Sequence, residues 1–478
     1  MNTAGDGLDL RPFRGVRYDP ERIGSLAAVT SPPYDVVVRP DGLLHLESAD
    51  PHNIVRLILP QATSPQSRND QAAATLHRWL AEGVLAADTE PALYVYEQRN
   101  GELLQRGLIG ALRLSEVAEG VVLPHEDVMP HIVEDRAGLM RTTEANFEPL
   151  LLTYRGNDPV TTGSTDAGPT TAGPTADNPA VDRAPADNPT VGKAPGDNSA
   201  NDKAPEDETP GAAATLIEHT TRHTTPLLST TTEDGYSHRL WAITDPSDIR
   251  TVQDDLSHRQ ALIADGHHRW ATYLRLRAEH PSPTPWDHGL VLLVDTARYP
   301  LRVRAIHRLL NNLPLDEALA AASPHFRIRE VAGPLPSAME SLAEAARHGN
   351  AFLLTGTADR YYLLDRPDAA LLDRTVPKDR PEPWRTLDAT VLHSTLLAHL
   401  WGIAEDSPAD VTYIHAMDAT VEKARRDGGT AVLMHPVREE VVRELARQGV
   451  TMPRKSTSFG PKPATGLVLR TLTDDGND

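Results

Sequence analysis

The amino-acid sequence predicts a mixed α/β fold, of the α/β or α+β type, and three observations lead to this prediction. Short apolar segments typical of strands alternate with longer amphipathic segments typical of helices. The chain has 478 residues, which is too long for one ordinary hydrophobic core, so we expect two or three domains. A middle segment has a composition that cannot form a core, and it divides the chain.

The first region, residues 1–156, is expected to be α/β. We expect a helix over residues 69–85, with Asn69 or Asp70 as its N-cap and Gly83 near its end. Segments rich in β-branched and aromatic side chains, bounded by turn-forming residues, predict strands. The segments with this character are 53–60, 92–98 and 108–117.

The second region, residues 157–212, is expected to be a disordered acidic insert. Up to residue 210 it is built mainly from Ala, Pro, Asp, Asn, Thr and Gly, and it contains no Leu, Ile, Phe, Tyr, Trp or Met. A ten-residue period is marked by Asp177, Asp187, Asp197 and Asp207. With so little apolar surface to bury, the segment cannot offset the entropy that ordering it would cost. We expect it to serve as a linker.

The alternation of strands and helices resumes after the insert. Residues 213–299 are expected to form a core region, and residues 300–478 a further α/β region. Asp245 and Pro246 are expected to open a helix over 245–259, because Asp is a good N-cap and Pro suits the first turn. The other predicted elements are strands over 236–244, 260–264, 289–295 and 430–436 and a helix over 438–449.

The composition argues against several classes of protein. The formal net charge of −20 disfavours a surface that grips nucleic acid or an anionic membrane. The absence of cysteine excludes disulfides, thiolate nucleophiles and cysteine-based zinc sites. The first residues show no signal-peptide pattern, and no apolar run approaches the roughly 20 residues that span a bilayer. We therefore expect a cytoplasmic protein with a small-molecule partner and without nucleic-acid or membrane partners.

The first candidate site is the segment ADGHHRW, residues 264–270, where a predicted strand runs into a predicted helix. The free N–H groups and the dipole of a helix N-terminus attract phosphate, and histidine and arginine side chains add donors. Asp265 is a candidate N-cap, or a ligand for the Mg²⁺ that accompanies a nucleotide. The residues of this site would be Asp265, Gly266, His267, His268 and Arg269. A capped helix with surface histidines and a histidine-based metal site are the alternatives.

The second candidate site lies in residues 123–136, where His125 and Glu126 follow Pro124 at the end of a strand-like segment. A carboxylate on a turn beside a histidine is suited to take a proton from a hydroxyl group. The alternative interpretation is an acidic loop that faces water.

Two further segments have polar patterns. Residues 452–469 place the candidates Lys455, Ser456 and Thr457, together with Lys462, in one loop, and ammonium and hydroxyl groups suit an oxyanion. The alternative is a turn-rich loop before a final strand. Residues 31–37 (SPPYDVV) present Tyr34 and Asp35 as a polar wall or as part of a structural turn.

These segments together resemble a known family. RPFRGVRYDP, SPPYDVV, NIVRL, ADGHHRWATY and MPRKSTSFGPKPATGLV resemble the family called domain of unknown function 1015, over nearly the whole chain except the insert. The order of Pro-His-Glu, Asp-Gly-His-His-Arg-Trp and Lys-Ser-Thr is also similar to that in the ADP-dependent free serine kinases. Those kinases have the ParB/sulfiredoxin-like superfold, which the resemblance implies for the core of this chain.

The resemblance to the serine kinases implies roles for the three motifs. Glu126, beside His125, would be the general base, and the turn from Asp265 to Arg269 would hold the phosphates of ADP or ATP and Mg²⁺. Lys455, Ser456 and Thr457 would hold substrate or phosphate. The function implied is a kinase for a small hydroxylated molecule, with free L-serine as the leading acceptor. The alternatives are a nucleotide- or phosphometabolite-binding regulatory protein and a histidine-based metal-dependent hydrolase.

Overall fold

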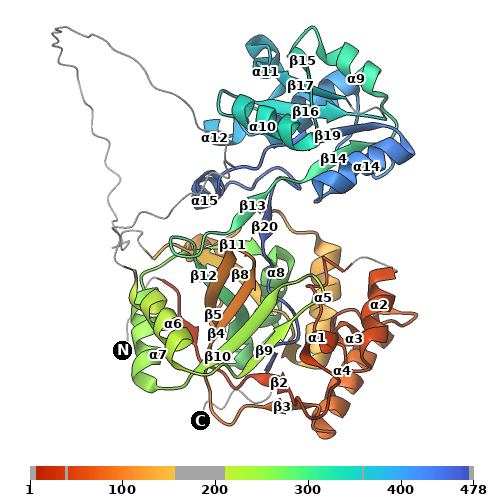
Figure 1. Cartoon of the computed structure of the whole chain (residues 1–478). Helices are drawn as coiled ribbons and strands as arrows, with labels where there is room; N and C mark the ends of the chain where they lie inside the picture. Colours follow the sequence, from red (N-terminus) through yellow and green to blue (C-terminus); the bar gives the residue numbers. More distant parts are fainter. Residues whose placement is uncertain (1–6, 38–40, 157–209, 358–359, 473–478) are drawn as a thin grey trace, which may run out of the picture.

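The chain forms a larger and a smaller lobe, joined by a short ribbon of two strands (Figure 1). The computed structural model describes residues 7–37, 41–156, 210–357 and 360–472. Each lobe combines a β-sheet with helices, so the predicted mixed α/β class is confirmed. The acidic insert predicted over 157–212 lies outside the described residues except for 210–212, where helix α6 begins.

The sheet of the larger lobe has nine strands and draws them from both sides of the insert. Its order is β6 (Val122–Leu123), β11 (Ala261–Asp265), β8 (Leu150–Tyr154), β12 (His288–Asp295), β5 (Leu103–Arg113), β4 (Leu93–Asn100), β10 (Ser237–Ile243) and β9 (Leu228–Thr231), with β1 (Leu10–Arg11) beside β5. β6 is parallel to β11 and β8 is parallel to β12, whereas the other neighbours are antiparallel. The segments before and after the insert therefore interleave in one sheet.

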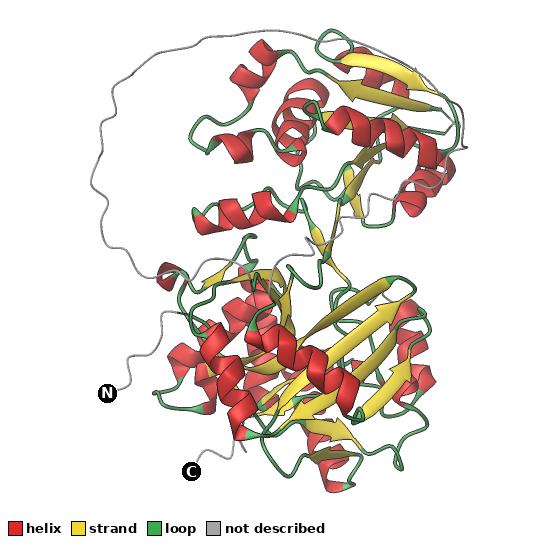
Figure 2. Ribbon diagram, turned by 60° about the vertical axis from the view of Figure 1, so that its left-hand side comes forward, coloured by secondary structure: helices red, strands yellow, loops and turns green. Residues whose placement is uncertain are grey.

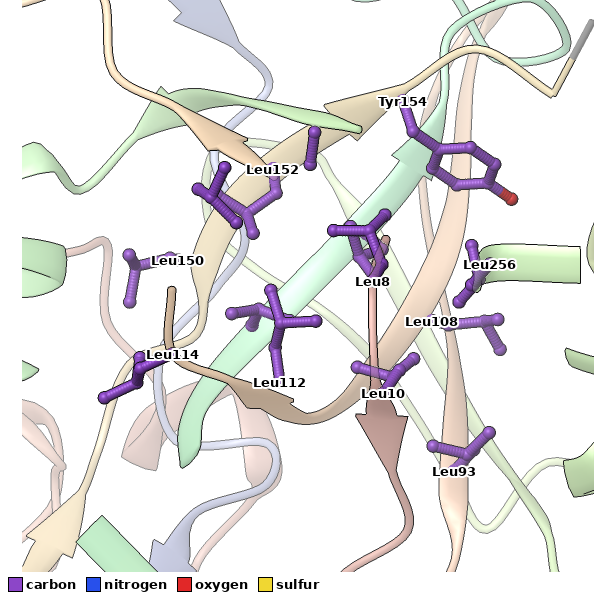
Figure 3. Packing of buried hydrophobic residues seen from close by; sticks show 14 of the residues in the cluster. Leu8, Leu10, Leu93, Leu108, Leu112, Leu114, Leu150, Leu152, Tyr154 and Leu256 are labelled. Atoms are coloured by element: carbon purple, nitrogen blue, oxygen red, sulfur yellow. The ribbon is translucent and has the colours of Figure 1, made fainter. Parts of the chain in front are cut away.

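Four helices contribute to the main core of the larger lobe (Figure 2). They are α5 (Pro130–Thr143), α6 (Ala212–His223), α7 (Pro246–Leu256) and α8 (His267–Glu279). Figure 3 shows the leucines of this core gathered from β1, β4, β5, β8 and α7: Leu10, Leu93, Leu108, Leu112, Leu150, Leu152 and Leu256. Such close packing holds the strand ends in place, and those ends carry the candidate site.

A second core of the larger lobe is completed by the end of the chain. Helix α15 (Glu439–Arg447) places Val442 and Leu445 against sheet residues such as Leu151 and Leu262. The residues that follow α15 run through β20 (Ser458–Gly460) to β21 (Arg470–Thr471), which pairs with β7 (Ala145–Asn146). The loop at 452–469 thus belongs to the larger lobe in space.

The N-terminal region adds a helical layer with its own core, beside the short ribbon of β2 (Val16–Tyr18) and β3 (Leu85–Ala87). Its helices are α1 (Leu26–Val29), α2 (Asp41–Ala49), α3 (Val55–Ile58) and α4 (Pro65–Ala81). The strand predicted over 53–60 is wrong, because Asn53 accepts from the backbone N–H of Val55 at 2.9 Å and starts α3 there. The predicted helix over 69–85 is shifted, since Ser64 caps it and Pro65 opens it.

Most of the other predicted elements are confirmed. The strand predicted over 92–98 is β4, and the helix predicted over 245–259 is α7, capped by Asp245 as expected. The predicted strand over 430–436 and helix over 438–449 are β19 and α15. Across the part of the chain that the structure describes, none of the helices is both long and apolar enough for a membrane crossing.

The smaller lobe is an antiparallel sheet with helices around it. Its strands are, in order, β15 (Arg327–Val331), β17 (Tyr361–Asp365), β16 (Ala351–Thr355), β19 (Thr430–Met434), β14 (His307–Leu310) and β18 (Val411–Ile414). Its helices are α9 (Leu315–Ala322), α10 (Leu335–Ala346), α11 (Ala369–Thr375), α12 (Glu382–Arg385), α13 (Asp388–Val391), the π-helix η3 (Leu392–Trp401) and α14 (Met417–Asp427). The ribbon between the lobes pairs β13 (Arg302–Arg304) with β20.

Candidate functional site

The parallel pairing of β6 with β11 brings two of the predicted site segments together. Ala261 pairs with Val122, and Leu262 pairs with Leu123. The carboxyl ends of adjacent parallel strands meet at one edge of a sheet, which is where open α/β sheets bind ligands. The Pro-His-Glu turn leaves β6 and the Asp-Gly-His-His turn leaves β11 at this edge.

The side chains of His267 and His268 fasten these two turns to each other. The backbone N–H of His125 donates to Nε2 of His267 at 3.2 Å, and the N–H of Met129 donates to Nε2 of His268 at 3.1 Å. Burial lowers the pKa of both imidazoles, and most strongly that of His267, so the rings are neutral. The sequence predicted that these histidines would donate to phosphate. In the structure their Nε2 atoms instead accept hydrogen bonds from backbone N–H groups.

Glu126 belongs to the first of these two turns, and its side chain is 33 % exposed. Because Nε2 of His267 accepts a hydrogen bond, the neutral ring carries its proton on Nδ1, and this nitrogen is 3.9 Å from Oε2 of Glu126. Burial raises the pKa of Glu126 to about 7, opposed by the nearby Lys455 ammonium and assisted by the Asp265 carboxylate. A carboxyl group with this pKa is suited to accept a proton at neutral pH.

The C-terminal loop reaches the same turns. Oγ1 of Thr457 is 3.2 Å from Nε2 of His125, and the backbone N–H of Met452 donates to the carbonyl oxygen of His125 at 2.8 Å. Burial lowers the pKa of His125 to about 4, so that this ring is also neutral. Ser456 instead donates from Oγ to the carbonyl oxygen of Pro453 within the loop. The structure therefore brings parts of all three predicted motifs together.

Charged side chains form a second cluster around Asp265. Nη2 of Arg269 donates to Oδ2 of Asp265 at 2.8 Å, and Nζ of Lys462 lies 2.5 Å from Oδ1. Lys462 also lies 2.5 Å from Oδ2 of Asp35. Arg269 is only 2 % exposed, and its Nη1 donates to the carbonyl oxygens of residues 148 and 149 at 3.4 and 3.2 Å. The guanidinium expected to hold phosphate is thus turned inward, where it positions Asp265.

The residues around Asp265 do not fit the Mg²⁺ ligand role that the sequence predicted. A magnesium ion needs carboxylate oxygens that are free to coordinate it, and both oxygens of Asp265 face cationic side chains. Within the described ranges no group of three or more His, Cys, Asp or Glu residues is arranged to hold a metal ion. The same finding gives the alternative of a histidine-based metal hydrolase no support.

Gly266 joins β11 to α8 in a conformation that favours glycine. Its φ is +101°, and it is the N-cap of α8 without a side-chain cap for the first helical N–H groups. A Cβ atom here would lie 2.9 Å from Cγ of Leu150 and 3.1 Å from Nη2 of Arg269. The turn therefore leaves the N-terminus of α8 without a side-chain cap while bringing its backbone close to β8.

Replacing Gly266 with Ala is expected to lower the free energy of unfolding by about 2–4 kcal/mol, through left-handed strain and overpacking. Urea unfolding followed by tryptophan fluorescence measures this loss. The matched control is Gly83→Ala, because Gly83 also has a positive φ, +71°, but has open space around its Cβ position. Its loss should be about 1–2 kcal/mol. Equal losses in the two variants would show that close packing at Gly266 has no importance.

Several residues near the site were missed or left aside by the sequence prediction. Glu148 is buried and accepts from the backbone N–H of Tyr34 at 2.8 Å, and burial raises its pKa. The guanidinium of Arg136 lies 4.6 Å from the centre of the Tyr34 ring. Nothing in the sequence around Glu148 marks it, since it stands between a phenylalanine and a proline before a buried strand. Asp35 and Lys462 belong to segments that the sequence marked as candidates, but only the fold shows that they form an ion pair.

A comparison with protein-family models gives one match. The model described as "Protein of unknown function (DUF1015)" matches residues 10–180 and 206–390, which is well over half of the chain. The comparison with curated proteins gives no match.

The comparison with solved structures gives several remote similarities. A free serine kinase in complex with AMP is 14 % identical with a TM-score of 0.31, over 71 % of this chain and 83 % of that one. SbnI with a C-terminal truncation, from Staphylococcus aureus, is 9 % identical with a TM-score of 0.33, over 77 % and 90 %. A conserved hypothetical protein from Pyrococcus furiosus is 11 % identical with a TM-score of 0.30, over 71 % and 87 %.

Proposed function

We propose that this chain, which belongs to the DUF1015 family of proteins of unknown function, is a kinase that phosphorylates a hydroxyl group of a small molecule. The observation that carries the proposal is the place of Glu126. Its carboxyl group, whose pKa is raised to about 7, stands at the sheet edge where α8 begins without a side-chain cap. A proton acceptor and an anion-binding helix end at one edge suit phosphoryl transfer.

The phosphates of ADP or ATP would bind at the N-terminus of α8. The first N–H groups of this helix have no side-chain cap, and the helix dipole adds positive potential there. Lys462 is held between Asp265 and Asp35, and its ammonium group has three protons, of which the two carboxylates use two. The exposed Lys455 adds a second cation, close enough to Glu126 to lower the pKa of that carboxyl.

In the proposed reaction Glu126 takes the proton of the acceptor hydroxyl as its oxygen attacks the terminal phosphorus. The new P–O bond joins the acceptor to the phosphoryl group, and the bond from that phosphorus to the bridging oxygen breaks. The electron pair stays on the leaving phosphate of AMP or ADP, whose charge Lys462 and the α8 terminus would stabilise. The Nδ1–H of the neutral His267 ring would face Glu126 from 3.9 Å, which is beyond hydrogen-bond distance.

Free L-serine is the acceptor we propose to test first. The choice rests on the order of the Pro-His-Glu, Asp-Gly-His-His-Arg-Trp and Lys-Ser-Thr motifs, which is similar to that in the free serine kinases. The three motifs meet through contacts of His125 with His267 and Thr457. A binding protein without turnover is the second candidate, and the engagement of both Asp265 oxygens by cations favours it.

Calorimetry and a turnover assay together test the proposal. The purified protein is titrated with ADP and with ATP, and then incubated with each nucleotide, MgCl₂ and L-serine or a panel of hydroxylated metabolites. The kinase predicts nucleotide binding and acceptor-dependent nucleotide consumption. Binding without consumption for any acceptor would support the binding protein instead. A protein that binds neither nucleotide would contradict both candidates.

A further inference from the structure

A buried arginine of the smaller lobe contacts the loop that carries Lys455. Arg308 lies on β14, just beyond the ribbon that joins the lobes (Figure 1). Its side chain is 0 % exposed, and Nη2 donates to the carbonyl oxygen of Lys455 at 3.1 Å. It is therefore a direct contact between the smaller lobe and one of the three site motifs.

Arg308 is buried without a carboxylate partner. Among the described residues no carboxylate lies within ion-pair distance of its guanidinium, and burial lowers its pKa to about 10. Its other partners are the carbonyl oxygen of Ile306, Sδ of Met434 at 3.0 Å, Nε2 of His393 at 2.9 Å and the face of the Tyr413 ring, 5.1 Å away. Burying a guanidinium whose direct partners are all neutral is costly, so a role in positioning the groups that it contacts explains its presence better than stability does.

The contact with His393 extends to the protein surface. A guanidinium can only donate, so Nε2 of His393 accepts and its Nδ1 carries the proton, which faces Oε2 of Glu405. His393 lies on the π-helix η3, and π-helical segments recur at functional sites. Glu405 is 38 % exposed. Glu405, His393 and Arg308 thus form a hydrogen-bonded chain that ends at the carbonyl oxygen of Lys455.

Lys455 has a backbone conformation that needs support. Its φ is +54°, which is strained for a residue with a Cβ atom by about 1–3 kcal/mol. The bond from Arg308 holds the carbonyl group in this conformation. Lys455 is exposed, and its positive charge opposes the rise that burial causes in the pKa of Glu126. The backbone conformation therefore sets the direction in which the Lys455 side chain leaves the loop.

We propose that Arg308 is a positioning residue that holds Lys455 in its left-handed conformation, so that the smaller lobe fixes the ammonium group beside Glu126. His393, which Glu405 contacts, orients the guanidinium from the side of the smaller lobe. A role of Arg308 in catalysis rests on the proposed kinase function. The positioning itself has a physical consequence that can be measured without turnover.

Carboxyl NMR titration of Glu126 is the first test, with the Glu126 signal assigned by its loss in Glu126→Gln. Lys455→Gly should raise the titration midpoint of Glu126 by about 0.5 pH unit because it removes the nearby ammonium group, and Arg308→Met should raise it by a similar amount because it releases that group from its place. In the Lys455→Gly background, Arg308→Met should add nothing further. An unchanged midpoint in folded Arg308→Met, or an equal shift in the Lys455→Gly background, would overturn the inference.

Glu405→Ala provides a second test if Arg308→Met does not fold, because Glu405 lies at the surface. It should shift the midpoint in the same direction by a smaller amount. Its matched control is Glu330→Ala, which removes a 53 % exposed glutamate of the same lobe outside the chain and should change nothing. No shift in Glu405→Ala, or the same shift in both variants, would contradict the inference.

Kinetics then separate this inference from the proposed function. If the protein is a kinase, Arg308→Met should lower kcat/KM about tenfold in the wild-type background and have no further effect in Lys455→Gly. A wild-type protein without nucleotide binding would refute the kinase and leave the NMR result standing. Active variants with unchanged kinetics and an unchanged midpoint would refute the positioning role alone.

Discussion

Replacing Glu126 with Gln is expected to lower kcat about a hundredfold to ten-thousandfold, the usual contribution of a general base. The amide keeps the shape of the side chain but cannot take the proton of the acceptor hydroxyl. Nucleotide affinity should remain close to that of the wild type, because the phosphates would bind at the N-terminus of α8. Steady-state kinetics and calorimetry on the same preparation measure the two effects.

The role of Glu126 as a base also predicts how kcat/KM changes with pH. Burial raises the pKa of Glu126 to about 7, so below that pH the carboxyl group is protonated and cannot act as a base. The wild-type kcat/KM should therefore rise about tenfold per pH unit below 7 and level off above it. The control is Asp127→Asn, which changes the exposed neighbouring carboxylate and should leave kcat unchanged. A Glu126→Gln protein with wild-type activity would remove Glu126 from the mechanism.

Replacing Arg269 with Met is expected to lower the free energy of unfolding by about 3–5 kcal/mol, because it removes one partner of a buried ion pair. Asp265 would lose one of its two cationic partners, and the carbonyl oxygens of residues 148 and 149 would lose their donor. Glu148, which is buried nearby, would also lose a compensating charge. Chemical unfolding followed by fluorescence measures the effect.

A matched control lies two turns along the same helix. Arg275 is 44 % exposed and pairs with Glu134 and Glu279 at the surface, so Arg275→Met should change the free energy of unfolding by less than about 1 kcal/mol. This pair of variants separates the two interpretations of Arg269. A stable Arg269→Met protein that has lost nucleotide affinity would restore the phosphate contact predicted from the sequence and contradict the positioning role found here.

The local elements of the fold could largely be predicted from the sequence, because they rest on patterns within a few residues. Asp245 capping α7 is an example, since a capping side chain and its helix are adjacent in sequence. Residues 53–60 show the limit of this approach. Their apolar run suits a strand, but the Asn53 side chain accepts from the backbone N–H of Val55 at the start of α3 and also donates to the carbonyl oxygens of residues 28 and 30.

The composition of the site could be predicted in part, but its geometry could not. The pairing of β6 with β11 joins strands that are about 140 residues apart, and no local pattern specifies it. The same holds for Lys462, whose partners Asp35 and Asp265 lie in two distant segments. The roles of His267 and Arg269 were harder still, because the sequence shows that they can donate but not which way they face.

Phosphorus NMR can follow the proposed transfer of a phosphoryl group to a small hydroxylated acceptor as it happens. Wild-type protein is incubated with ADP or ATP, MgCl₂ and L-serine, and then with the acceptor panel. A kinase should give a new phosphomonoester resonance that grows as the terminal phosphate resonance of the nucleotide declines, and that is absent with Glu126→Gln. A spectrum that stays unchanged with every acceptor, or that gives only inorganic phosphate, would contradict the proposed transfer.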